Sequence, residues 1–143
     1  MRLPDVNVLL YAFRDAAPDH ARYRSWLEAA LVADEPFGVS DLVLSSFVRI
    51  ATHPRVFDPP ATVEEALAFA NAVRAAPNAV ALAPGPRHWS LFGRLCRDGG
   101  ARGNLVADAH LAALAVESGS ELVTTDRDFA RFPGLRWRHP LAE

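Results

Sequence analysis

Three aspartates stand where an ionised side chain is unusual. Asp5 ends a short apolar segment at the start of the chain, and Asp126 ends another at residues 121–125. Asp108 lies inside segment 104–118, which is almost wholly apolar. A carboxylate in apolar surroundings is costly unless it is paired or bound to a metal ion. The three aspartates are therefore candidates for one site.

Carboxylates that gather within a few Å repel one another, and the pKa of at least one rises unless a cation is present. Oxygen ligands of this kind suit Mg²⁺ or Mn²⁺ rather than Zn²⁺. Such an ion can position a phosphate, help to deprotonate water and stabilise a leaving oxygen. We therefore predict that the three aspartates are metal ligands and catalytic residues. The polar neighbours Asn7, Thr125 and Asp128 are candidates for orienting them.

Each aspartate also has a purely structural interpretation. Asp5 and Asp126 can cap the helices that follow them, and Asp108 can lie at the solvent edge of a buried helix. A capping carboxylate can still turn one oxygen toward an ion, so the two interpretations are compatible. For Asp128, simple solvent exposure is the alternative.

Strands and helices alternate along the chain. The hydrophobic patterns predict strands at 2–5, 37–40, 79–82, 121–125 and 135–137, and helices at 7–13, 18–33, 41–51, 62–76, 86–99 and 104–118, with a helical turn at 126–131. Asp41 is the expected cap of the third helix, and Trp89 belongs to the expected apolar side of the fifth. We expect a single α/β domain over residues 1–143, with a central parallel sheet of four to five short strands flanked by helices on both faces. Ligands of such sheets bind beyond the carboxyl ends of the strands, where Asp5 and Asp126 fall.

The composition narrows the function. A net charge of −2 argues against a strongly basic nucleic-acid coat, although all 15 basic residues are arginines, whose planar fork suits phosphate. A biased genome would produce the same preference for arginine. No signal-peptide pattern and no apolar run long enough to span a membrane is evident, and Cys96 stands alone, so we expect a cytoplasmic protein.

Three segments together resemble the PIN-domain ribonucleases, and within them the VapC-type toxins of bacterial toxin–antitoxin pairs. They are LPDVNVLLYA from Leu3, GNLVADAHLAALA from Gly103 and LVTTDRDF from Leu122. The resemblance implies a PIN fold, Mg²⁺ or Mn²⁺, and endonucleolytic cleavage of a structured RNA such as tRNA or rRNA. It also implies a homodimer and a small cognate VapB-type antitoxin. Asp5, Asp108 and Asp126 match the family's acidic positions, and Asn7 and Thr125 match polar positions beside them.

One position departs from the family pattern. Ser46 occupies the place where the family usually has a glutamate, three residues before Arg49. Asp41 is a candidate for a replacement carboxylate, and Arg49, Arg102 and Arg127 are the expected RNA contacts. The missing glutamate leaves open a catalytically weak or inactive module that binds RNA or protein. A metal-dependent phosphohydrolase acting on a small molecule is a remoter alternative, because Asp5-Val-Asn7 lacks the second aspartate of an Asp-x-Asp pair.

Overall fold

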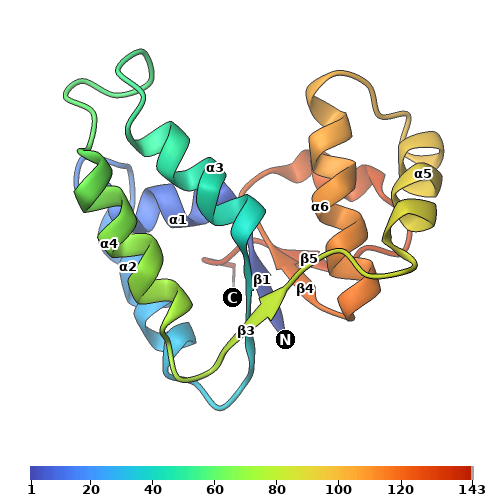
Figure 1. The fold of residues 1–143 in the computed structure, drawn as a ribbon, viewed down its shortest axis with the longest axis horizontal. Coiled ribbons are helices and arrows are strands. Elements are labelled where there is room, and N and C mark those ends of the chain that lie inside the picture. The colour runs from blue at the N-terminus through green and yellow to red at the C-terminus, as the bar shows by residue number, and fades with distance from the viewer. Residues whose placement is uncertain (143) are drawn as a thin grey trace.

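A five-stranded, wholly parallel sheet forms the centre of the protein (Figure 1), as the computed structural model of residues 1–142 shows. The strand order is β3-β2-β1-β4-β5. The strands are β1 (Arg2–Pro4), β2 (Phe37–Ser40), β3 (Ala79–Leu82), β4 (Glu121–Val123) and β5 (Trp137–Arg138). The predicted parallel sheet is confirmed, and β3 and β5 are its two edge strands.

Helices cover both faces of the sheet (Figure 1). They are α1 (Val6–Phe13), α2 (His20–Leu31), α3 (Asp41–Ala51), α4 (Val63–Arg74), α5 (His88–Asp98) and α6 (Asn104–Ser118), with a 3₁₀ turn, η1 (Arg127–Arg131). The chain moves from β1 to β2 to β3 through α1–α4, and then crosses back to β4 through α5 and α6. Because parallel crossovers are right-handed, this reversal places α1–α4 on one face and α5–α6 on the other.

The core lies between the sheet and these two helical layers. Phe37, Phe47 and Leu122 are among its largest fully buried side chains. Helix α6 contributes mostly alanines, which let it lie close to the sheet, and it ends at Gly119, whose φ of +68° favours glycine. Within residues 1–142, none of the helices combines the length and the apolar character that crossing a membrane requires.

Two predicted details of the helix starts are wrong. The side chain of Ser40, rather than that of Asp41, caps α3 by accepting a hydrogen bond from the Val43 amide. Asp41 instead pairs with Arg74 of α4, at 3.0 Å between Oδ1 and Nε. Helix α5 begins only at His88, because the amides of Gly85 and Arg87 donate to the Glu117 carboxylate at the end of α6.

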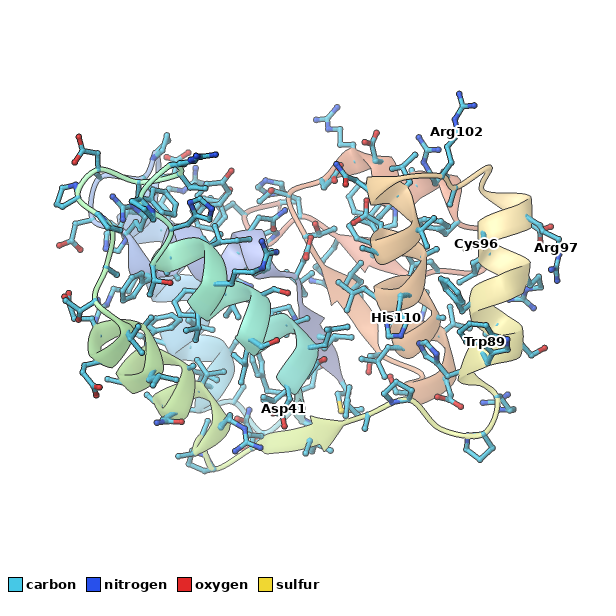
Figure 2. The ribbon with its side chains drawn as sticks, turned by 45° about the horizontal axis from the view of Figure 1, so that its top comes forward. Asp41, Trp89, Cys96, Arg97, Arg102 and His110 are labelled. Carbon is cyan, nitrogen blue, oxygen red and sulfur yellow. The ribbon has the colours of Figure 1, made fainter. Side chains whose placement is uncertain are left out.

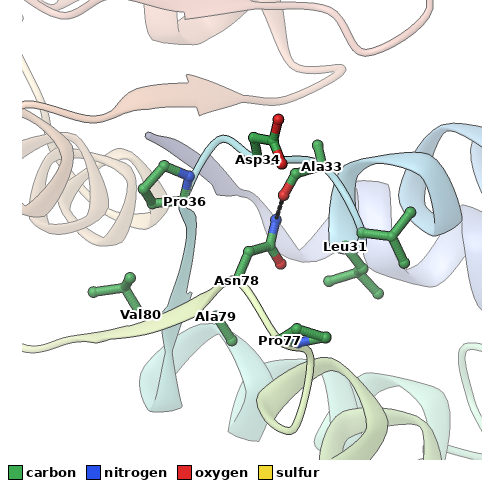
Figure 3. A pocket seen from close by; sticks show the side chains of 9 residues that line it. Leu31, Ala33, Asp34, Pro36, Pro77, Asn78, Ala79 and Val80 are labelled. Carbon is green, nitrogen blue, oxygen red and sulfur yellow. Dashed lines mark hydrogen bonds between the residues drawn. The ribbon is translucent and has the colours of Figure 1, made fainter.

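A surface hollow lies where the chain enters β3 (Figure 3), and Asn78 is one of the residues that line it. Its Nδ2 donates to the carbonyl oxygens of Ala30, Ala33 and Glu35 at 2.8, 3.0 and 2.8 Å. These carbonyls belong to the end of α2 and the loop that leads into β2. Asn78 therefore fastens the α2–β2 loop to the start of the edge strand.

We expect Asn78→Asp to lower the free energy of unfolding by about 2 kcal/mol. The substitution keeps the shape of the side chain but removes the amide that donates to three carbonyl oxygens in the wild type. A carboxylate oxygen, which repels them, takes its place. Urea unfolding measures the effect, with Asn71→Asp on the exposed face of α4 as the matched control. Equal midpoints for the two variants would contradict the fastening role of Asn78.

Candidate active site

Neighbouring strands bring Asp5 and Asp126 to the same edge of the sheet. Strands β1 and β4 pair in register, with Pro4 opposite Val123 at their carboxyl ends. The Asp5 amide continues this pairing by donating to the Val123 carbonyl at 2.9 Å. Asp5 is then the N-cap of α1 and Asp126 the N-cap of η1. Both caps that the sequence allowed are confirmed, and both aspartates lie where ligands of α/β sheets bind.

A buried hydroxyl connects these two aspartates. Thr124, whose side chain is 0% exposed, donates from Oγ1 to Asp5 Oδ2 at 2.8 Å and accepts the Asp126 amide at 3.0 Å. The other oxygen of Asp5 accepts the Val6 amide at 2.7 Å. Asn7 adds a longer contact, 3.5 Å from its Nδ2 to Thr124 Oγ1. Thr124 thus fixes the position of Asp5 relative to the chain at Asp126.

The sequence predicted Thr125, rather than its neighbour Thr124, as the polar residue beside the acids. Thr125 contributes its backbone amide, which donates to Asn7 Oδ1 at 3.5 Å. The predicted polar environment therefore exists, but the hydroxyl in contact with the acids comes from the preceding residue. Strand β4 ends at Val123, and the next residue, Thr124, is the one whose side chain is buried.

Asp108 lies on α6, near enough to these carboxylates for their charges to act on it. Burial, as the largest cause, and the negative charges of Asp5, Asp126 and Asp128 together raise its pKa to about 6. Burial also raises the pKa of Asp5; the hydrogen bonds from Thr124 and Val6 oppose this effect, and the Asp126 charge adds to it. The three predicted acids are therefore close enough to interact through their charges.

Other candidates take more peripheral places. Asp128 is exposed, and its amide donates to Asp126 Oδ1 at 2.8 Å. Ser46 is half-buried on α3, while Arg49, Arg102 and Arg127 are exposed. Asp41 is engaged by Arg74 in an exposed pair, so the structure gives no support to Asp41 as a replacement carboxylate. Arg131, which the sequence analysis did not single out, is the cation that lowers the Asp108 pKa.

The chemistry of these side chains fits a hard divalent cation. Within residues 1–142, none of the ion pairs involves Asp5, Asp108 or Asp126. The Asp108 carboxylate also accepts no hydrogen bond within residues 1–142, which leaves both of its oxygens available to a cation. Within the described residues, no group of three His, Cys, Asp or Glu side chains lies close enough together to hold a metal ion. The mutual repulsion of these oxygens is nevertheless what a bound cation would relieve.

The raised pKa of Asp108 makes the stability of the metal-free protein depend on pH. Its folded pKa of about 6 lies above the ordinary 3.8, so stability falls as pH rises between these values. We expect Asp108→Asn to match the wild type near pH 4 and to melt roughly 3 °C higher above pH 7, after allowance for solvent screening. Thermal melts in EDTA across this range measure the difference. A difference independent of pH would contradict the assigned cause.

The fold agrees with the comparisons to known proteins. The chain belongs to the PIN-domain family, whose model matches residues 2–135. Its relatives in sequence are VapC ribonucleases. VapC ribonuclease Mb2897 of Mycobacterium bovis is 50% identical over 137 residues, which cover 96% of this chain and 93% of that protein. Ribonuclease VapC25 of Mycobacterium tuberculosis is 46% identical, with 98% and 99% of the two chains covered.

Solved structures share the fold at lower sequence identity. The complex VapBC2 from Rickettsia felis, bound to a DNA fragment from its promoter, contains a chain that superposes with a TM-score of 0.69 at 19% identity. That match covers 96% of this chain and 97% of the other. VapC20 of Mycobacterium tuberculosis, described as a toxin that cleaves the sarcin–ricin loop, gives a TM-score of 0.67 at 16% identity, with 95% and 99% covered. At these identities the structures establish the fold alone.

Proposed function

We propose that this protein is a VapC-type toxin, an endoribonuclease that depends on Mg²⁺ or Mn²⁺ and cleaves a structured RNA such as tRNA or rRNA. The observation that carries the proposal is the group of aspartates at the carboxyl ends of β1 and β4 and on α6. Their charges act on one another, and none of them forms an ion pair within residues 1–142. The VapC ribonucleases, 46–50% identical over nearly the full chain, support the same activity.

Asp5, Asp108 and Asp126 would hold the ion, which when bound supplies electrostatic stabilisation for phosphodiester hydrolysis. The rest of the work belongs to the chain itself. Thr124 and the Val6 amide hold the Asp5 carboxylate in one orientation. Arg131 places a positive charge beside Asp108, where a phosphate of the substrate would also be attracted. Arg49, Arg102 and Arg127 are proposed as further phosphate contacts, so RNA binding should weaken as salt is added.

The proposed partners follow from the same relatives. The VapBC complexes of matching fold support a small VapB-type antitoxin as the inhibitor of this chain. A homodimer, as the toxins of this kind form, and a cytoplasmic location, where tRNA and rRNA are found, complete the proposal. Light scattering of the purified chain, alone and with its antitoxin, tests the assembly.

Ser46 supports a second candidate function. A half-buried serine stands at the position where the family usually has a glutamate, so one carboxylate fewer faces the proposed ion. A domain that binds RNA or a protein without cleaving RNA is therefore the competing assignment. The two functions differ in one measurable property, since only the enzyme loses its effect on RNA when the metal is removed.

The deciding experiment incubates the purified protein with a mixed tRNA and rRNA pool in Mg²⁺, in Mn²⁺ and in EDTA. Discrete fragments that require the metal support the ribonuclease and supply the cleavage site for mapping. RNA that is bound but left intact in every condition favours the binding module. Inclusion of the antitoxin in a parallel reaction should suppress the fragments.

We expect Ser46→Glu to tighten Mn²⁺ binding by roughly 10-fold, because a fourth carboxylate adds negative charge near the ion. The same variant should melt at a lower temperature in EDTA, since the added carboxylate increases the repulsion that no cation relieves. Calorimetric titration with Mn²⁺ measures the affinity, and Ser45→Glu on the exposed neighbour of Ser46 is the control. Equal affinities for both variants would place residue 46 outside the metal site.

A further inference from the structure

Helix α5 carries an exposed tryptophan that the fold does not use. The periodicity predicted that Trp89 packs inward with Phe92 and Leu95, but its side chain is 77% exposed (Figure 2). The indole lies tilted against the Phe92 ring, at 5.3 Å between centroids. Phe92 in turn contacts His110 of α6 at 5.7 Å. Trp89 thus contacts Phe92 but leaves most of its aromatic surface exposed to solvent.

The next residues along the same side of α5 keep that surface flat. Gly93 stands one turn after Trp89, and Arg97 stands one turn after Gly93. Glycine inside a helix is unfavourable, and Gly93 needs neither a positive φ nor a close backbone approach. The atoms that an added Cβ would meet there all belong to the Arg97 guanidinium, at 3.5 to 4.0 Å. A planar cation therefore lies over the glycine, one turn along the helix from the exposed indole.

Helix α5 and the loop that follows it carry a net positive charge although the whole chain is slightly acidic. Helix α5 and the loop that follows carry exposed Arg94, Arg97 and Arg102 against one carboxylate, Asp98. None of the ion pairs found within residues 1–142 includes these three arginines. Figure 2 shows Arg102 near the loop between α5 and α6, with Arg97 and Trp89 further along α5. Their charge is therefore available to a ligand.

Arg131 connects this surface to the candidate active site. Its Nη1 donates to the Gly99 carbonyl at the end of α5, at 3.2 Å. The same guanidinium is the positive charge that acts on Asp108. Arg131 thus lies between the aspartates and the end of α5, and Arg102 lies in the loop that follows this helix.

We propose that Trp89, Gly93 and Arg97 form a stacking platform for an unpaired RNA base, on a part of the substrate away from the scissile phosphate. This assignment rests on the proposed ribonuclease function. Aromatic rings and guanidinium planes both stack on nucleobases, and neighbouring arginines attract the backbone phosphates. A protein partner would need a broader apolar area, whereas the exposed side chains further along α5 include Arg94 and Arg97. RNA is therefore the occupant that the chemistry of this face favours.

The test measures RNA binding in the Asp5→Asn background, where the proposed cleavage is blocked. A fluorescein-labelled unpaired RNA of about 20 nucleotides is followed by anisotropy, and we expect Trp89→Ala to raise its Kd by about 5- to 100-fold. Trp89→Phe should restore most of the affinity, because a phenyl ring also stacks. Val32→Ala, at a residue 75% exposed on the other side of the molecule, is the control and should leave the Kd unchanged.

Gly93→Leu provides a second variant, for which helix propensity predicts a gain rather than a loss of stability. Leucine favours the helix over glycine, so the melting temperature should rise, while its side chain displaces Arg97 and fills the flat surface. RNA affinity should therefore fall although stability increases. RNA should also quench more of the tryptophan fluorescence in the parent than in Trp89→Phe, since stacking brings a base onto residue 89.

The outcomes separate the platform from the ribonuclease itself. Unchanged Kd values for Trp89→Ala and Gly93→Leu, in a protein whose Asp5 form cleaves RNA, would overturn the platform and leave the function standing. Binding that depends on Trp89 without any cleavage would support the platform and remove the enzyme. Unchanged RNA affinity together with an altered oligomeric state would overturn the platform and assign Trp89 to a protein contact.

Discussion

Replacing Asp5 by asparagine is expected to lower metal-dependent RNA cleavage by about 10³-fold while the protein stays folded. Asparagine keeps an oxygen that can accept the Val6 amide, so the cap of α1 survives. It removes the negative charge from the carboxylate at the end of β1, where the proposed cation would bind. Rates of fragment release from the cleaved RNA in Mn²⁺ measure the effect, with Asp34→Asn as an exposed control remote from this edge.

The asparagine variant also has a signature in the absence of RNA. Mn²⁺ should raise the melting temperature of the wild type, because a ligand that binds only the folded state stabilises it. That increase should shrink or vanish in Asp5→Asn and persist in Asp34→Asn. A variant that keeps both cleavage and the Mn²⁺-dependent increase would exclude Asp5 from the metal site.

Thr124→Val is expected to lower both stability and activity, whereas the same change at Thr125 should do neither. Valine has the shape of threonine but lacks the hydroxyl, so Asp5 Oδ2 loses a donor and the Asp126 amide loses its acceptor. Leaving such buried groups unpaired costs about 2 kcal/mol. Loss of the contact that orients a proposed metal ligand should lower cleavage by about 10- to 100-fold.

Urea unfolding and cleavage rates, measured side by side, test this pair of variants. The Thr125 hydroxyl makes no hydrogen bond within residues 1–142, so Thr125→Val serves as a control of identical chemistry one residue away. A loss of activity in Thr124→Val without a loss of stability would still support the orienting role. Equal behaviour of the two valine variants would contradict it.

The general arrangement of the site could be predicted because it depends on local patterns. Apolar segments that each end in aspartate predicted strands whose carboxyl ends carry Asp5 and Asp126, and the parallel sheet places them together. Helix 104–118 was predicted with the observed bounds, since glycines stand on both sides of an uninterrupted apolar segment. The family resemblance, supported by three separate segments, supplied the activity that these patterns alone left open.

The remaining details depend on contacts between distant parts of the chain. Thr124 and Thr125 are chemically identical in the sequence, and only the end of β4 decides which hydroxyl turns toward Asp5. Ser40 and Asp41 are both good helix caps, and Arg74, from a later helix, draws Asp41 away. Arg131 reaches Asp108 across a gap of more than twenty positions, which no local pattern records.

Helix α5 packs chiefly on α6 and lies outside the sheet and its first helical layer. At its start the Glu117 carboxylate accepts two amides and the His88 ring donates to the His110 carbonyl. At its end Arg131 donates to the Gly99 carbonyl. In amide hydrogen exchange, such an outlying helix should open as a unit well before α6, which carries the buried alanines of the core. Its outer residues can consequently diverge between relatives without disturbing the aspartates. The proposed RNA contact on α5 and the proposed catalytic aspartates would therefore evolve on separate parts of this fold.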